Sequence, residues 1–199
     1  MRVPIVFLNV WKSSLFAVLI AGLAAFPVLA TEAPEVVAQL DPSNVLVIDV
    51  EAGPIYIELL PDVAPQHVDR VKQLASEGFY DGVVFHRVID GFMAQTGDPT
   101  GTGTGGSDYA DLPAEFSEIP YERGVVGMAR ARSPNSANSQ FFIMFAPAAS
   151  LNGAYTVFGR VVAGMDNVDA IKKGDPQLNG MVDEPDMMIR ARILSELES

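Results

Sequence analysis

The segment FHRVIDGFMAQTGD, residues 85–98, places one arginine and one glutamine among large apolar side chains. Arg87 precedes Phe92 and Met93, and Gln95 follows them closely. The segment contains no pairing of a nucleophile with a base and no set of metal ligands, which hydrolysis or group transfer would need. A guanidinium and an amide beside an apolar surface instead suit a reaction that depends on binding and on a strong hydrogen-bond donor.

The position of Arg87 alone leaves two interpretations open. If residues 83–89 form one strand, Arg87 shares a face with Phe85, because residues two apart point to the same side of a strand. We therefore expect both side chains to face the core. Arg87 is then either a functional donor or an arginine at an edge or interface, with its aliphatic stem along the apolar surface.

Two other features resemble chemical motifs but lack their context. GTGTGG, residues 101–106, matches G-x-G-x-x-G, yet the turn-like SDYADLP follows it where a dinucleotide site needs a helix. His67, on the polar side of an expected helix, and His86, inside an expected strand, have no second histidine or cysteine nearby. The serine-hydrolase pattern G-x-S-x-G does not occur in the sequence. We expect a loop at 101–106, structural histidines, and no metal or cofactor.

The composition indicates a single globular domain. Of 199 residues, 49% are hydrophobic and 19% are charged, so the chain can bury a sizeable core. The net charge is −12, and the longest basic clusters are Lys172–Lys173 and the pair Arg130 and Arg132. This balance argues against a nucleic-acid partner, because phosphate backbones select clustered lysine and arginine. Without cysteine, the chain forms no disulfide and carries no lipid-modified cysteine.

Residues 1–30 are predicted to be a signal peptide. Arg2 and Lys12 precede an apolar run whose core, residues 15–25, has the length of a signal-peptide core rather than of a membrane span. Pro27 and the small residues before Thr31 predict cleavage after Ala30. The alternative is an uncleaved N-terminal membrane anchor, because the segment from Val3 to Trp11 is also apolar. We expect an exported, periplasmic protein with a flexible leader at 31–43 and one domain at 44–199.

The elements that must position Arg87 and its neighbours are mostly short strands. Residues 44–60 predict two strands, and VVFHRVI and FMAQTG predict a hairpin closed by Asp90–Gly91. Further strands are GVVGMARA, QFFIMFA, VFGRVV and MMIRARIL. Two helices are predicted, one ending at Gly78 and one at Gly174. This pattern favours a closed barrel or a sandwich whose open ends the helices can cover.

The motifs FHRVIDGFMAQTGD, GTGTGG, GMARA, SQFFI and VFGRV, in this order, resemble the cyclophilins, the cyclosporin-family peptidyl-prolyl cis/trans isomerases. The resemblance runs from about Asn44 to Leu194. It implies a mainly β fold, a closed eight-stranded antiparallel barrel capped by two α-helices. It also implies a monomeric isomerase without metal or cofactor, whose partners are proline-containing unfolded or partly folded polypeptides.

Prolyl isomerisation explains why a site without a nucleophile is sufficient. The barrier is the partial double bond of the peptide C–N, so the enzyme need only bind the twisted amide best. The resemblance implies Arg87 as the catalytic arginine, Gln95 as its partner, and a peptide strand paired with residues 129–131. The residues that it implies for substrate binding are Phe92, Met93, Ala129, Arg130, Ala131, Gln140, Phe142, Leu151 and Tyr155.

Three positions depart from the pattern of the well-known eukaryotic members. Arg130 stands in place of asparagine, Ser150 in place of the tryptophan that contacts cyclosporin, and Tyr155 in place of histidine. The first and third departures resemble bacterial members. Because serine lacks the indole surface, the resemblance implies weak cyclosporin binding.

Two rival functions remain beside the isomerase. The first is a proline-peptide-binding chaperone module that uses the same groove without required turnover. The second is a structural envelope protein held by the uncleaved N-terminus. The presence of both Arg87 and Gln95 favours the enzyme, because proline binding alone does not need the arginine.

Overall fold

The computed structural model describes residues 34–197. The predicted signal peptide and its cleavage site lie outside the described residues. Every helix within 34–197 is too short or too polar to cross a membrane.

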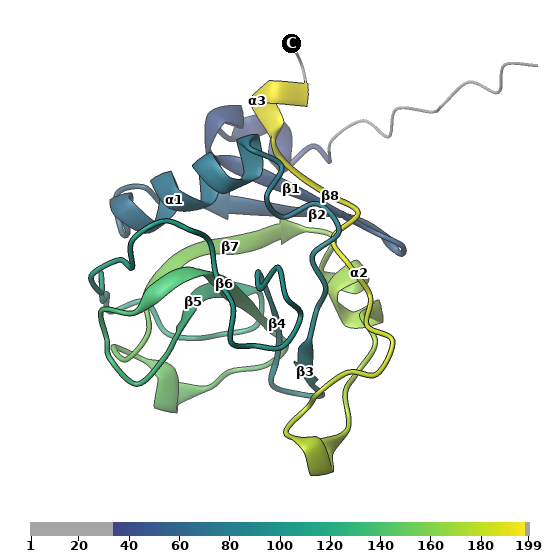
Figure 1. Ribbon diagram of the computed structural model, residues 1–199. Coiled ribbons are helices and arrows are strands. Elements are labelled where there is room, and N and C mark those ends of the chain that lie inside the picture. Colours follow the sequence, from purple (N-terminus) through teal and green to yellow (C-terminus); the bar gives the residue numbers. More distant parts are fainter. Residues whose placement is uncertain (1–33, 198–199) are drawn as a thin grey trace, which may run out of the picture. The chain divides into compact units, whose positions relative to one another are not determined.

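One antiparallel sheet contains all the strands of the described chain (Figure 1). The strands are β1 (Val45–Val50), β2 (Gly53–Leu59), β3 (Arg87–Ile89), β4 (Met93–Thr96), β5 (Val125–Arg130), β6 (Ala137–Met144), β7 (Val157–Ala163) and β8 (Arg190–Ile193). Their order is β3-β4-β6-β5-β7-β2-β1-β8, with neighbours antiparallel throughout. The prediction of a mainly β fold with eight antiparallel strands is confirmed.

The prediction that the barrel is closed is wrong, because β3 and β8 are the free ends of the strand order and form no ladder with each other. The segments before them meet only at the isolated bridge Val84–Met187 and at single bonds such as Phe85 N–H to Asp186 O, 2.8 Å. Glu184 has a φ of 49° and Pro185 has no N–H, so a regular ladder cannot extend through this segment. The sheet is a curled, open half-barrel.

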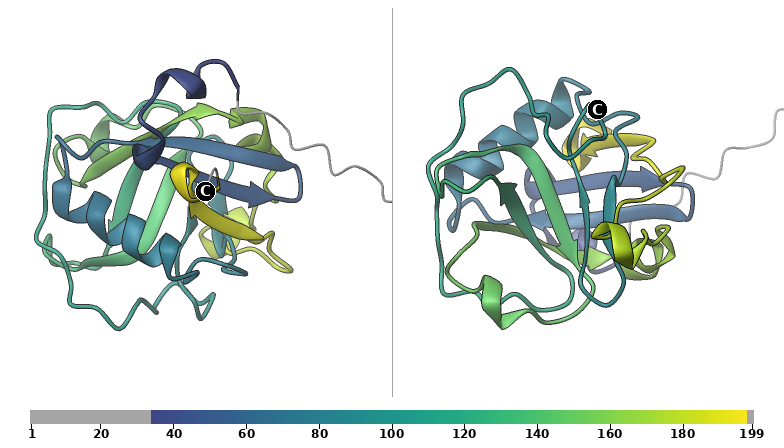
Figure 2. Two further views of the ribbon diagram at one scale, coloured as in Figure 1. Left: turned by 90° about the horizontal axis from the view of Figure 1, so that it is seen from above. Right: turned by 60° about the horizontal axis from the view of Figure 1, so that its bottom comes forward.

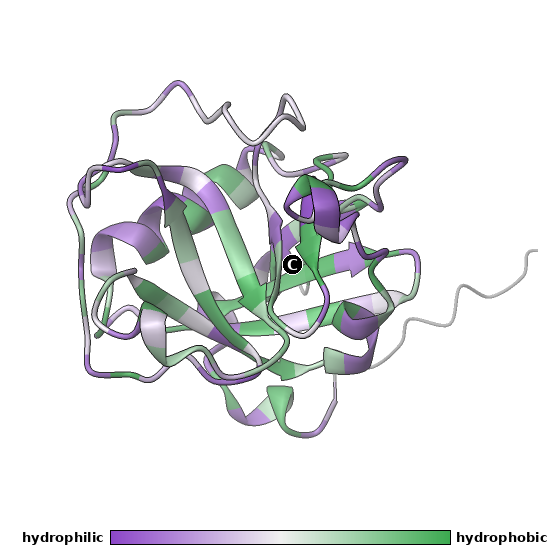
Figure 3. Cartoon of the chain, turned by 90° about the horizontal axis from the view of Figure 1, so that it is seen from below, coloured by the Kyte–Doolittle hydropathy of each residue, from purple (hydrophilic) through white to green (hydrophobic). Residues whose placement is uncertain are grey.

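The concave side of the sheet holds the main hydrophobic core. In β1, Leu46 and Ile48 point into this core, whereas Val45 and Val47 pack on the other face. Val37 covers that outer face from η1 (Val37–Gln39), and η2 (Pro42–Asn44) leads into β1. Figure 3 shows the resulting pattern, with hydrophobic residues concentrated along the strands. Val37 and Leu40 therefore hold the segment 34–44 against the outer face of the sheet.

Two of the three short helices correspond to those predicted. Helix α1 (Pro65–Ser76) packs against β6, β7 and β8 and lies across the curled sheet (Figure 2). It ends as predicted, with Gly78 at a φ of 71°. Helix α2 (Met165–Ala170) packs against β2, and α3 (Leu194–Leu197) follows β8. The remaining turns are η3 (Ala149–Leu151) and η4 (Pro176–Leu178).

Helix α2 ends at Ala170, four residues before the predicted end at Gly174. The backbone turns extended at Ile171, with φ −56° and ψ 130°. Gly174 serves a different purpose, because a Cβ at this position would collide with the carbonyl group of Gly180. The glycine permits two backbone segments to approach each other and does not cap the helix.

The N-terminus of α1 is capped by a distant carboxylate. Ala64 offers no capping side chain, and Glu115 accepts hydrogen bonds from the backbone N–H groups of Gln66 and His67 instead, at 3.2 and 3.1 Å. The His67 ring contacts the same carboxylate at 2.6 Å and is fully buried, so its predicted place on the polar side of the helix is wrong. Burial lowers the pKa of His67.

Candidate active site

The hairpin β3–β4 brings Arg87 and Gln95 directly opposite each other. The predicted turn at Asp90–Gly91 is confirmed, with Gly91 at a φ of 66° and Phe92 N–H donating to Ile89 O at 3.0 Å. Antiparallel pairing places side chains of opposite residues on the same face, so the guanidinium and the amide emerge together.

Arg87 does not share a face with Phe85, contrary to expectation. The strand begins only at Arg87, so strict alternation does not reach back to Phe85. Phe85 and Val88 both lie in the main core, whereas Ile89 packs in a separate apolar cluster on the outer face. Arg87 points to this outer face. His86, predicted inside a strand, lies just before β3 and is buried.

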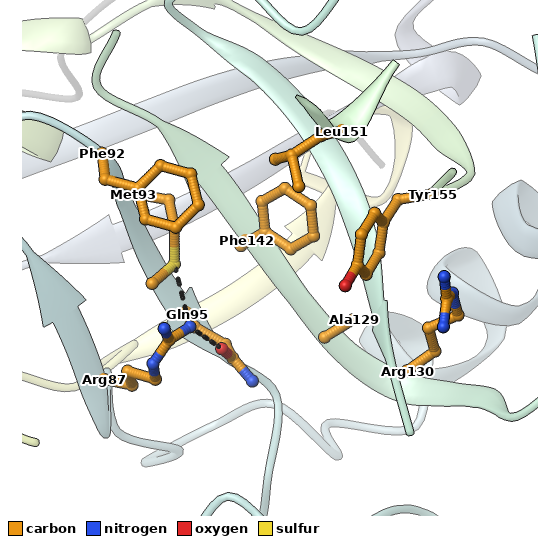
Figure 4. A pocket seen from close by; sticks show the side chains of 9 residues that line it. All are labelled: Arg87, Phe92, Met93, Gln95, Ala129, Arg130, Phe142, Leu151 and Tyr155. Carbon is orange, nitrogen blue, oxygen red and sulfur yellow. Dashed lines mark hydrogen bonds between the residues drawn. The ribbon is translucent and has the colours of Figure 1, made fainter. Parts of the chain in front are cut away.

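A cavity of about 210 Å³ opens on the outer face beside Arg87 (Figure 4). Its walls come from β3, β4, β5, β6, η3 and the segment before β7. The lining residues are Arg87, Phe92, Met93, Gln95, Ala129, Arg130, Phe142, Leu151 and Tyr155. All of them are residues that the sequence predicted for the site.

The apolar wall of this cavity is built around Phe142, whose side chain is 5% exposed. Its ring stacks on Tyr121 at 5.6 Å between centroids and meets Tyr155 edge-on at 5.8 Å. The Arg130 guanidinium lies over the Tyr155 ring, 4.4 Å from its centroid. The Phe142 ring is therefore held from two sides. Tyr121 was not predicted, because its loop position carries no periodic signal.

The Arg87 guanidinium is held by three hydrogen bonds to oxygen. Nη1 donates to Gln95 Oε1 at 3.1 Å, Nε donates to the Asn179 carbonyl at 3.0 Å, and Nη2 donates to Asn179 Oδ1 at 3.1 Å. An arginine has five N–H donors, so two remain. The remaining N–H of Nη1 donates to Met93 Sδ in the cavity wall at 3.9 Å, which places this nitrogen at the cavity and leaves one N–H, on Nη2, without a partner among the described residues (Figure 4). Burial lowers the pKa of Arg87.

Two glutamines connect Arg87 to the neighbouring loop. Gln95 Nε2 donates to Gln140 Oε1 at 2.9 Å, and Gln140 Nε2 donates to the Gly105 carbonyl at 2.8 Å. Gln140 and Ala131, the two remaining predicted residues, line an adjoining cleft of about 520 Å³ with residues 103–107. The structure thus brings all the predicted site residues to two cavities that share Gln95, Ala129 and Arg130.

Asn179 is a second site residue, after Tyr121, that sequence reasoning missed. It adopts a left-handed conformation, with φ 55°, at the start of an Asn-Gly pair. That pair is a turn signal, but nothing in it indicates contact with an arginine 92 residues away. Among residues 34–197, no group of three or more His, Cys, Asp or Glu side chains lies close enough together to bind a metal.

The loop at 101–106 is organised by the buried carboxylate of Asp98. The carboxylate accepts hydrogen bonds from the backbone N–H groups of Thr100, Gly103 and Gly105 at 2.7, 2.6 and 3.0 Å. A Cβ at Gly105 would collide with this carboxylate. The close approach explains why glycine occupies this position, and no bound nucleotide is needed for the explanation. Burial alone would raise the pKa of Asp98, but these bonds outweigh it and lower the pKa to about 2.

Asp98→Asn is expected to destabilise the chain by about 1–3 kcal/mol at neutral pH, because an amide leaves buried N–H groups without acceptors. The folded-state pKa of about 2 lies below the ordinary 3.8. The stabilisation is therefore complete above pH 4 and is lost as the pH falls toward 2. Urea unfolding of both forms from pH 6 to pH 2 measures the difference, which should shrink over that window. Asp108→Asn, an exposed carboxylate in the same loop region, is the control; an equal effect there contradicts the assignment.

Comparisons with known proteins identify one family. The family described as cyclophilin type peptidyl-prolyl cis-trans isomerase/CLD matches residues 45–193. A Brucella suis protein named "Probable peptidyl-prolyl cis-trans isomerase" is 53% identical over 181 residues, covering 85% of this chain and 92% of the relative. Peptidyl-prolyl cis-trans isomerase B of Bacillus subtilis is 44% identical over 126 residues, covering 63% of this chain and 87% of the relative.

Solved structures show the same fold. A cyclophilin from Hirschia baltica has a TM-score of 0.71 at 28% identity, covering 79% of this chain and 76% of that chain. A cyclophilin-type isomerase from Cryptosporidium parvum, crystallised in the presence of the dipeptide Ala-Pro, has a TM-score of 0.68 at 30% identity, covering 75% and 98%. With the family matched over nearly all of the described sheet, the chain belongs to the cyclophilin-type peptidyl-prolyl cis-trans isomerases.

Proposed function

We propose that this isomerase acts on X-Pro bonds of unfolded or partly folded exported polypeptides, as a monomer, with Arg87 as its catalytic donor. The observation that carries the proposal is the guanidinium at the mouth of an apolar cavity. The cavity walls of Phe92, Met93 and Phe142 suit a proline ring, and Arg87 lies at their open side.

The chemistry follows from the barrier. The barrier to rotation about the peptide C–N bond is about 18–20 kcal/mol, and it comes from conjugation across that bond. When the bond twists, conjugation is lost and the proline nitrogen becomes a hydrogen-bond acceptor. An N–H of Arg87 directed at that nitrogen stabilises the twisted state more than either planar state, which lowers the barrier. Gln95 and Asn179 hold the guanidinium in place, so little reorganisation is needed.

The substrate segment before proline is proposed to lie along the end of β5. Ala129, Arg130 and Ala131 line the larger cleft together with the loop held by Asp98. The backbone of residues 129–131 can pair with the substrate backbone, and the cleft beside it can hold a substrate side chain. The cleft and the proline pocket share Gln95, so a continuous peptide can reach both.

Export is the second part of the proposal. It is supported by the basic residues, the apolar core and the small residues within residues 1–30 of the sequence. N-terminal sequencing of the protein recovered from the periplasm tests cleavage after Ala30. An intact N-terminus in the membrane fraction would favour the anchored alternative.

A proline-limited peptide isomerisation assay on residues 31–199 tests the catalytic part. Acceleration well above the uncatalysed rate, which takes tens to hundreds of seconds, is expected. Peptide binding without acceleration would instead indicate the chaperone module.

Weak inhibition by cyclosporin is expected, together with a gain for Ser150→Trp. Ser150 is exposed in η3, next to Leu151 of the pocket wall. A tryptophan there supplies an aromatic surface and an N–H donor at the rim, a contact commonly worth about 2 kcal/mol or roughly thirtyfold in affinity. Inhibition titrations of both forms side by side measure the change. Nanomolar inhibition of the native form, or no gain in the variant, contradicts this prediction.

A further inference from the structure

A further cleft adjoins Arg87 on the side opposite to β5. It has a volume of about 230 Å³ and shares Arg87 and Gln95 with the proline pocket. One wall is the end of η4 and the turn that follows it, with Leu178, Asn179 and Met181. The other wall is the loop at 101–103. A ligand in the proline pocket can therefore extend into this cleft across Arg87.

Two exposed side chains of the cleft, Leu178 and Met181, are large and apolar, and they lie beside the exposed polar residues Thr102 and Asn179. Leu178 and Met181 are 60% and 58% exposed, the highest values among the large hydrophobic side chains of residues 34–197. The opposite wall contains Gly101 and Gly103, which add no side chain to the cleft. Exposed apolar side chains beside a binding pocket gain free energy when a ligand covers them.

The inner side of the cleft adds no charge beyond Arg87. His86 is buried there, and neither ring nitrogen has a hydrogen-bond partner among the described residues. Burial lowers the pKa of His86, so the ring is neutral at neutral pH. A neutral ring and two apolar side chains suit an apolar group better than a charged one.

The sheet order defines the direction in which a peptide would run. From β5 the order continues through β6 and β4 to β3, and Met181 forms a bridge with Arg87 beyond β3. Figure 4 shows Arg87 and Gln95 on one side of the pocket, and Tyr155 and Arg130 on the other. If the segment before proline lies along β5 and proline fills the pocket over β4 and β6, the chain after proline leaves toward β3.

We propose that the cleft between Leu178, Met181 and residues 101–103 binds the side chain of the residue that follows proline, and that it selects an apolar one. The inference rests on the proposed function, because it uses the peptide direction assigned there. It makes Leu178 and Met181 specificity-determining residues that do not contact the reacting bond.

The test compares three peptides, Ala-Ala-Pro-Leu, Ala-Ala-Pro-Gly and Ala-Ala-Pro-Glu, with the full-length protein. The native form is expected to show a kcat/KM for the Leu peptide roughly five- to tenfold above that for the Gly peptide. In the double variant Leu178→Ser with Met181→Ser, this ratio should fall to within about twofold of one. Ile189→Ser, which removes a side chain 56% exposed outside the cleft, should leave the ratio unchanged.

Three results would overturn the inference. Equal values for the Leu and Gly peptides in the native form would show that the cleft is not used. Preference for the Glu peptide would show that the charge of Arg87 dominates. An equal loss on all peptides in the double variant would show that the turn positions Arg87 and does not bind substrate. Failure of the proposed function is distinct, because the native form would then accelerate none of the peptides and the inference would fall with it.

Discussion

Arg87→Ala is expected to lower kcat/KM for proline peptides by roughly 10²–10³-fold while the fold is kept. Nη1 of Arg87 lies at the pocket beside Gln95, whereas the guanidinium of Arg130, which also lines the pocket, lies over the Tyr155 ring. Its side chain lies outside the main core, so truncation opens no internal void. A proline-limited isomerisation assay at substrate concentrations below KM, with thermal melting of the same samples, measures both effects.

Two further variants make the result specific. Arg87→Lys keeps a positive charge but not the planar set of donors, so it should recover only a small part of the activity. Arg123→Ala removes an arginine that pairs with Asp169 away from the pocket, and should leave turnover unchanged. Near-native turnover in a folded Arg87→Ala protein would contradict the proposed mechanism.

Phe142→Ala is expected to cost about 3–5 kcal/mol of unfolding free energy and to lower turnover as well. The ring is almost completely buried, and it packs between Tyr121 and Tyr155 at the base of the cavity. Its removal leaves a void under the proposed position of the proline ring, so both the packing and the grip on substrate are lost. Urea unfolding and the peptide assay measure the two consequences separately.

The matched control for this variant is Phe116→Ala, which truncates a phenylalanine that is 46% exposed. It should change stability by less than about 1 kcal/mol and leave turnover intact. Phe142→Leu, which keeps most of the volume, should fall between the native form and alanine. If Phe142→Ala melts and turns over like the native protein, the ring does not form the pocket wall.

Local signals accounted for the parts of the site that lie within one hairpin or one helix. Asp90–Gly91 indicated the tight turn that aligns Arg87 with Gln95, and the αL glycine Gly78 indicated the end of α1. The apolar wall was predicted from the family resemblance. Strand alternation alone did not predict it and assigned Arg87 to the wrong face of the sheet. The turn and the helix end were predictable because each depends on residues that are close together in the chain.

The features that were missed depend on contacts between distant segments. Glu115 caps α1 from a loop nearly fifty residues away, and this contact explains why His67 is buried. Asn179, which lies 92 residues after Arg87 in the sequence, accepts two hydrogen bonds from its guanidinium. Periodicity reports which face of an element is apolar, but it does not report which loop returns to that face. The closed barrel was predicted from the number of short strands and from the family resemblance, and neither indicates that β3 and β8 remain unpaired with each other.

The open seam of the half-barrel has a consequence for aggregation. An unpaired strand edge is a template for adding a further strand, a hazard for a protein whose substrates include extended chains. The β3 edge is covered, because Val88 N–H donates to Gly180 O and Gly174 N–H donates to Val88 O, at 2.8 and 2.9 Å. On β8, the Asp81 carboxylate accepts from Ala191 N–H at 3.1 Å. The β3 edge is therefore covered and an outward N–H of β8 is already bonded, so an extended polypeptide meets fewer unpaired groups at the sheet edges, whereas the pocket is accessible.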